Sequence, residues 1–113
     1  MSLSYVDFLK HINDEIAFVL SKTEGISQED FNKDDVLSRA VIRSLEIVGE
    51  ASKKLPQEFK EKYPHIDWKE IAGTRDKLIH DYFGVDYDIV WDIIKNELPE
   101  LQAEINRIIK LEK

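Results

Sequence analysis

The sequence predicts an all-α fold, an antiparallel bundle of four to five helices. Apolar residues recur at three- and four-residue steps along most of the chain, and no segment shows the alternation of a β-strand. With 113 residues the chain has the usual size of one domain, so we expect residues 1–113 to form a single helical domain. The chain contains no cysteine, so its stability must come from packing rather than from disulfides.

The first half of the chain predicts two long helices. Residues 4–21 carry an apolar stripe with helical spacing: Tyr5, Phe8, Leu9, Ile12, Ile16, Val19 and Leu20. Residues 22–33 predict a connection with room for one helical turn. Asp34 or Asp35 would cap the second helix, because a short carboxylate accepts hydrogen bonds from the free amides of a first turn. The stripe of that helix is Val36, Leu37, Ala40, Val41, Leu45, Val48 and Leu55.

Two apolar residues lie off this stripe. Ile42 and Ile47 suggest that the second helix has another covered face, and a partner subunit is one explanation.

Prolines and glycines divide the second half of the chain. Pro56 ends the second helix or opens a short one, and Pro64 stops that segment because it lacks a backbone donor. A further helix should begin near Asp67 and end at Gly84 with a left-handed cap; it carries Trp68, Ile71, Leu78 and Ile79. The last helical segment begins at Asp86, and Pro99 marks a kink or a new helical start within it.

Charge and motif content exclude several classes of function. The net charge of −7 opposes non-specific binding of nucleic acid, so binding of RNA would need a local basic site. No apolar run is long enough for a membrane span and no signal peptide is visible, so we expect a cytoplasmic protein without a membrane partner. Phosphate-binding glycine loops, serine-hydrolase turns and Glu-x-x-His metal motifs are absent. His11 and Glu15 alone are weak evidence for a metal, so we expect neither metal nor cofactor.

The segment from Gly73 to Phe83 gathers the residues best suited to chemistry. Arg75, Lys77, His80 and Tyr82 lie within eight residues of an otherwise acidic chain. Histidine transfers protons near neutral pH, and the guanidinium fork of arginine matches phosphate oxygens. His80 could therefore transfer a proton while Arg75 stabilises charge on a phosphate attacked by a neighbouring 2′-hydroxyl of RNA.

Spacing alone leaves another interpretation open. Five residues correspond to about 140° around a regular helix, so Arg75 and His80 would share a site only if the helix distorts or a twofold dimer brings two copies together. Alternatively, Arg75, Asp76 and His80 form a polar network that orients the helix.

Residues 68–98, reading WKEIAGTRDKLIHDYFGVDYDIVWDIIKNEL, resemble the signature region of the HepT-like branch of the HEPN superfamily. The Arg-x4-His-x-Tyr motif is complete, and residues 39–51 resemble the second-helix signature of the family. The resemblance implies a HEPN-like bundle and a homodimeric, metal-independent endoribonuclease that acts as the toxin of a toxin–antitoxin system. Its partner would be a minimal nucleotidyltransferase antitoxin, and its substrate would be RNA.

The resemblance also implies roles for single residues. Arg75 and His80 map onto the catalytic pair, Asp76 would have a supporting role, and Tyr82 maps onto the tyrosine to which the antitoxin transfers AMP. The added bulk and negative charge would repel an RNA phosphate. Because some HEPN domains do not cut RNA, the alternative is a noncatalytic helical module that binds a nucleotidyltransferase or a nucleotide. On the nuclease interpretation, basic residues should converge around the cleft: Arg39, Arg43, Lys69, Arg75 and Lys77.

Overall fold

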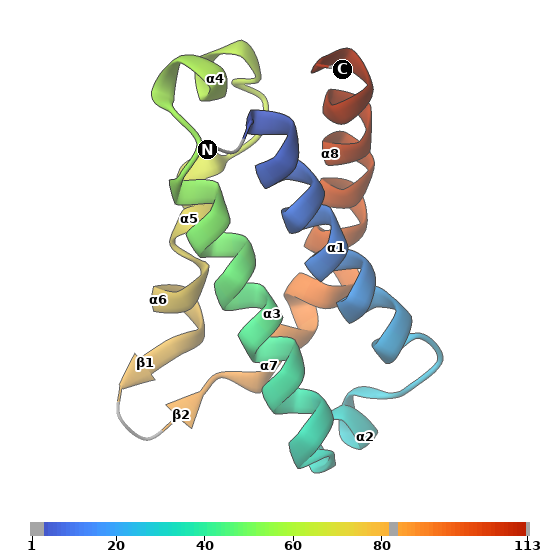
Figure 1. Ribbon diagram of the computed structural model, residues 1–113. Coiled ribbons are helices and arrows are strands. Elements are labelled where there is room, and N and C mark those ends of the chain that lie inside the picture. The colour runs from blue at the N-terminus through green and yellow to red at the C-terminus, as the bar shows by residue number, and fades with distance from the viewer. Residues whose placement is uncertain (1–3, 82–83, 113) are drawn as a thin grey trace.

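Three long helices form the body of the protein. The structure is a computed structural model that describes residues 4–81 and 84–112, and for residues 79–81 it describes the backbone only. Helices α1 (Tyr5–Thr23), α3 (Asp35–Lys53) and α8 (Leu98–Glu112) are the longest elements. Figure 1 shows α1 packed against both others and antiparallel to each of them. The predicted all-α antiparallel bundle is confirmed.

Short polar side chains start the helices at the expected places. The Ser4 hydroxyl accepts a hydrogen bond from the Asp7 amide at 3.2 Å, and the Asp7 carboxylate accepts one from the Ser4 amide at 3.1 Å, which completes a capping box. Asp34 accepts from the Leu37 amide at 2.9 Å, so the predicted cap of α3 is confirmed. Asp67 and Asp86 likewise cap the helices that follow them.

Short helices connect the long ones. The connection after α1 contains one brief helix, α2 (Gln28–Lys33). Pro56 directly precedes the short helix α4 (Gln57–Lys62), so it opens a helix, which is one of the two roles predicted for it. The remaining short helices are α5 (Trp68–Ala72), α6 (Thr74–Leu78) and α7 (Tyr87–Asp92). Among the described residues, no helix is both long and apolar enough to cross a membrane.

The core lies where α1, α3 and α8 meet, and it holds most of the predicted stripe residues. The largest fully buried side chains are Phe31, Phe59, Leu9, Ile12, Ile16, Leu45, Leu78, Ile94, Ile105, Ile108, Val19 and Val41. Val36 is an exception, because 81% of it is exposed. It lies five residues before Val41, or about 140° around the helix, and therefore faces away from α1. The prediction that Val36 belongs to the core is wrong.

Ile42 and Ile47, the two apolar residues off the main stripe of α3, are buried to different degrees within the single chain. Ile42 is buried at 9% exposure within the chain itself, so it needs no partner subunit. Ile47 is half-buried.

The helix predicted from Asp67 to Gly84 is interrupted. It breaks at Gly73 into α5 and α6, and after Leu78 the backbone extends into strand β1 (Ile79–Asp81), which pairs antiparallel with β2 (Gly84–Val85). Ile79 is a β-branched residue that favours extended backbone, and this preference prevails over the helical spacing. Gly84 therefore opens a strand, and the predicted helix cap at this position is wrong.

A π-helical turn precedes α8. In η1 (Ile93–Glu97) the amide of Leu98 donates to the carbonyl of Ile93, five residues earlier. Pro99 has no amide hydrogen for the carbonyl four residues before it, so the regular ladder cannot pass through this point. Right-handed helical angles at Asp92 and Leu98 show that the backbone continues from α7 through η1 into α8, so the fresh helical start that was one of two outcomes predicted for Pro99 does not occur.

Candidate functional site

Arg75 lies on the surface of α6 and contacts α3. Its side chain is 61% exposed, and its Nε atom lies 3.4 Å from Oε2 of Glu46, whose side chain is only 23% exposed. The contact is made through Nε, and most of the Arg75 side chain is exposed to solvent. The terminal nitrogens of a guanidinium are donors that can bind a phosphate. Glu46 therefore holds the guanidinium while most of the side chain stays accessible.

A close approach of α5 to α3 determines the position of α6. A Cβ atom built on Gly49 of α3 would lie 3.2 Å from the carbonyl oxygen of Ile71 and 3.4 Å from that of Ala72. The Thr74 hydroxyl donates to the same Ile71 carbonyl at 2.6 Å, which holds the junction between α5 and α6. The absence of a side chain at Gly49 lets the two backbones meet, so that α6 begins next to Glu46.

Lys77 belongs to a different environment from Arg75. Its Nζ atom lies 3.1 Å from Oε1 of Glu70 and 3.5 Å from Oε2 of Glu97 in η1. Burial opposes the charge of Lys77, but the two carboxylates outweigh it and raise the pKa of the lysine. Burial also raises the pKa of Glu97, assisted by its contact with Glu70, while Lys77 acts in the opposite direction. Lys77 is thus neutralised between α5 and η1, and it does not join Arg75.

The other predicted site residues are only partly described. Asp76 is exposed on α6, and no hydrogen bond or ion pair joins its side chain to another residue in the described ranges. His80 lies in β1, beyond the end of α6, so the angle of a regular helix does not apply between it and Arg75. The side chain of His80 and the whole of Tyr82 lie outside what the structure describes. The roles of Asp76, His80 and Tyr82 stay predictions.

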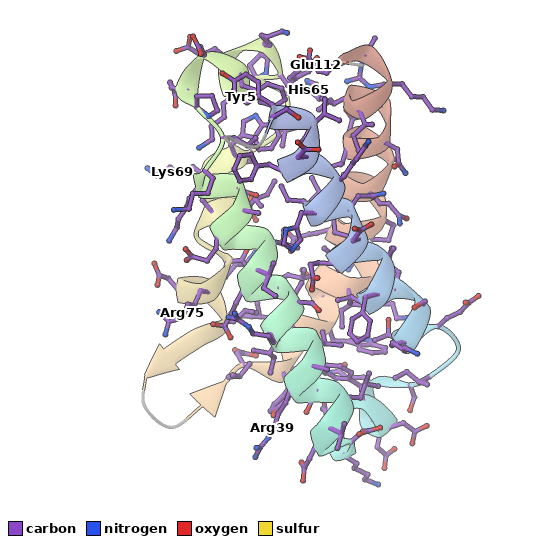
Figure 2. All side chains as sticks on the ribbon, viewed as in Figure 1. Tyr5, Arg39, His65, Lys69, Arg75 and Glu112 are labelled. Carbon is purple, nitrogen blue, oxygen red and sulfur yellow. The ribbon has the colours of Figure 1, made fainter. Side chains whose placement is uncertain are left out.

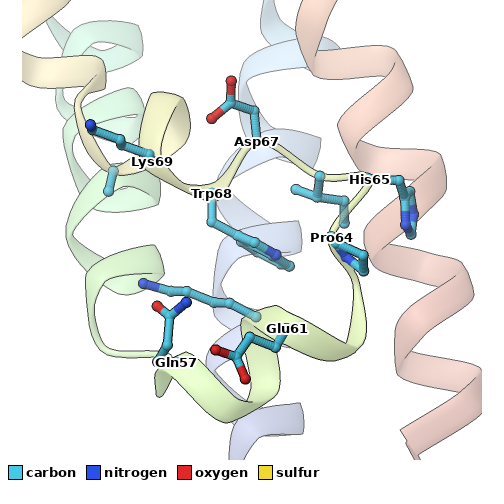
Figure 3. A pocket seen from close by; sticks show the side chains of 10 residues that line it. Gln57, Glu61, Pro64, His65, Asp67, Trp68 and Lys69 are labelled. Atoms are coloured by element: carbon cyan, nitrogen blue, oxygen red, sulfur yellow. The ribbon is translucent and has the colours of Figure 1, made fainter.

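A hollow of the described surface lies at another place. It has a volume of about 740 Å³, and its lining includes Lys60, Lys69, Glu61 and Asp67. Figure 3 shows Trp68 in its middle, with charged side chains of both signs around it. Arg75, the motif residue whose side chain the structure describes, does not line it. The hollow is therefore separate from Arg75.

The residues in the described ranges contain no group of three or more His, Asp or Glu side chains that could hold a metal ion. His11 and Glu15 lie on α1, and no third ligand of this kind accompanies them there.

Sequence reasoning missed Glu46 as part of the site. The residue lies within the segment that resembles the family's second helix, but nothing in local spacing connects it with Arg75, which is 29 positions later in the sequence. The available signal was the row Arg39, Arg43 and Glu46, which repeats at four and three residues on one face of α3.

Comparisons with known proteins agree with the predicted resemblance. The family model "Ribonuclease HepT-like" matches residues 12–108. A protein of Caldanaerobacter subterraneus subsp. tengcongensis named "Putative RNase TTE0752" is 56% identical over 94% of this chain and 95% of its own length. "Probable ribonuclease HepT" of Thermococcus cleftensis is 44% identical over 97% of this chain and 100% of its own length. No solved structure gives a significant match. The chain belongs to the ribonuclease HepT-like family.

Proposed function

We propose that the protein is a metal-independent endoribonuclease, the toxin of a toxin–antitoxin system. Membership of the ribonuclease HepT-like family, together with an intact Arg-x4-His-x-Tyr motif whose arginine lies in α6 and whose histidine lies in β1, is the observation that carries the proposal. The named relatives are described as ribonucleases, which agrees with an RNA-cutting activity for this chain.

In the proposed reaction the 2′-hydroxyl of RNA attacks the adjacent phosphorus. The new O2′–P bond forms as the P–O5′ bond breaks, which leaves a 2′,3′-cyclic phosphate and a 5′-hydroxyl. His80 transfers a proton during this exchange, and Arg75 stabilises the charge on the pentacoordinate phosphorus. No metal is needed, because the arginine supplies the positive charge that a metal ion would otherwise supply.

The contact between Arg75 and Glu46 supports this role for the arginine. An exposed arginine samples many rotamers, and immobilising such a side chain on binding costs about 0.5–1.5 kcal/mol. Glu46 limits that freedom through Nε, while most of the Arg75 side chain stays exposed to solvent. We assign Glu46 as a positioning residue, with Asp76 in a supporting role.

The proposed active form is a homodimer in which the site lies at a twofold cleft. An isologous interface would bring two copies of α6 and β1 together. Val36 is 81% exposed and Ile47 is only half-buried, which supports a partner surface along this side of α3. Sedimentation of the purified protein tests this part of the proposal, because a monomer at all concentrations would contradict it.

The proposed antitoxin is a minimal nucleotidyltransferase that transfers AMP to the hydroxyl of Tyr82. The modification would place a negative charge two residues from His80 and repel the RNA phosphate. Intact-mass spectrometry before and after incubation with the partner and ATP would detect one added AMP, and Tyr82→Phe should abolish it.

The main test compares wild type with His80→Ala on a structured RNA in excess chelator. Mass spectrometry must first show that Tyr82 carries no nucleotide. We expect cleavage by the wild type, cyclic phosphate ends, and no cleavage by the variant. Absence of cleavage by the unmodified wild type across several RNAs would reject the nuclease and favour a noncatalytic module that binds a nucleotidyltransferase or a nucleotide.

A further inference from the structure

Three exposed cations near Arg75 form no ion pair with the residues that the structure describes. Arg39 and Arg43 on α3 and Lys69 on α5 are exposed, and none of the three forms an ion pair with another residue of the described ranges. Some basic residues are paired, as Lys33 is with Glu29 and Lys53 with Glu50, whereas the described ranges show no ion pair for several other lysines: Lys10, Lys22, Lys54, Lys60, Lys95 and Lys110. What distinguishes Arg39, Arg43 and Lys69 is their position near Arg75, and in a chain with a net charge of −7 such a local group of cations could attract a polyanion.

These cations flank Arg75. Arg39, Arg43 and Glu46 follow one row of α3, and Glu46 is the residue that contacts Arg75. Seven residues separate Arg39 from Glu46, or about 10 Å along the helix axis. In the view of Figure 2, Lys69 and Arg75 lie at the left edge, with Lys69 above Arg75, and Arg39 lies at the lower end of α3. In this view the proposed catalytic Arg75 therefore lies between Arg39 and Lys69.

We infer that Arg39, Arg43 and Lys69 form a track for the RNA backbone that leads the strand across Arg75. Arg39 and Arg43 bind phosphates on one side of the cut phosphodiester, and Lys69 binds a phosphate on the other side. Lys77 takes no part, because Glu70 and Glu97 hold it in a separate cluster. This inference rests on the proposed function, since it assigns how the same site holds its substrate.

The experiment measures how RNA binding depends on salt. Each lysine or arginine that contacts a phosphate of a single strand adds about 0.7 to the slope of log affinity against log salt concentration. A labelled single-stranded RNA is titrated with His80→Ala protein, so that the RNA stays uncut. We expect the double variant Arg39→Gln/Arg43→Gln to reduce the slope by about 1.4, and Lys69→Gln to reduce it by about 0.7.

The matched control is Lys10→Gln/Lys22→Gln. Both lysines are exposed on α1, which packs on the buried side of α3, and the control loses the same two positive charges as the arginine pair. We expect its slope to equal that of the parent. Circular dichroism should show the same helicity in every variant as in the His80→Ala parent, because the added substitutions are all at exposed helix positions.

An unchanged salt slope in Arg39→Gln/Arg43→Gln would overturn the track. An equal reduction of the slope in the lysine control would also overturn it, because RNA binding would then depend only on the overall charge of the protein. Cleavage by the wild type is measured separately. If the wild type cuts RNA and the slopes do not change, the track is wrong and the nuclease stands. If the slopes fall as expected and the wild type does not cut, the track is an RNA-binding surface and the proposed catalysis is wrong.

Discussion

The substitution Gly49→Ala should lower the free energy of unfolding, although alanine normally stabilises a helix relative to glycine. At a free helical position, replacement of glycine by alanine stabilises by about 1 kcal/mol. At Gly49 the new Cβ atom would lie 3.2 Å from the Ile71 carbonyl oxygen, and that carbonyl is held by the Thr74 hydroxyl at 2.6 Å. Overpacking of this kind costs about 1–3 kcal/mol. The net expectation for Gly49→Ala is a loss of about 1 kcal/mol in the free energy of unfolding.

Urea unfolding followed by circular dichroism measures this change. Glu50→Ala serves as the control, because Glu50 is exposed on the same helix and its ion pair with Lys53 is also exposed. The control should change stability by less than about 0.5 kcal/mol. A stabilisation of Gly49→Ala by about 1 kcal/mol would refute the reasoning, because it would show that α5 does not press against α3 at this point.

The remaining predictions concern the core and two carboxylates. Phe31→Ala should cost about 3–5 kcal/mol in urea unfolding, because Phe31 is fully buried, whereas Phe18→Ala, at 38% exposure, should cost clearly less. Glu97→Gln should raise the melting temperature at neutral pH and leave it unchanged below about pH 4, because the raised pKa of Glu97 means that its ionised form weakens the fold as pH rises. Glu112→Gln should behave in the opposite sense and lower the melting temperature at neutral pH only, because Lys62 lowers the pKa of Glu112 and that stabilisation is lost as pH falls. Melting temperatures of both variants are measured across pH. A change of the same sign in Glu97→Gln and Glu112→Gln at neutral pH would contradict this pair of predictions.

The long helices could be predicted from sequence because local chemistry determines them. Ser4 and Asp34 show the helix starts through their short polar side chains, and the apolar spacing of α1 identifies its buried face. Val36 escaped this reasoning, since spacing alone does not tell which edge of an apolar stripe a neighbouring helix covers. The break after Leu78 was also missed, because the helical spacing of Leu78 and Ile79 conceals the preference of Ile79 for extended backbone.

The candidate site shows a similar division. Arg75 and His80 are visible in the sequence because their side chains suggest the chemistry. Glu46 is not visible in this way, since its contact with Arg75 depends on how closely α5 approaches α3 at Gly49. A contact between distant segments is a property of packing, and a single sequence contains no direct signal for it.

The central claim is that Arg75 and His80 cleave RNA through its own 2′-hydroxyl. The most direct test maps a cleavage position with the wild type and repeats the reaction on the same RNA with one 2′-deoxynucleotide immediately before that bond. The account predicts that cleavage disappears at this bond, persists at other sites of the same strand, and is absent everywhere with His80→Ala. Cleavage of the substituted bond at the original rate would contradict the account, because the attacking group would then have to come from elsewhere.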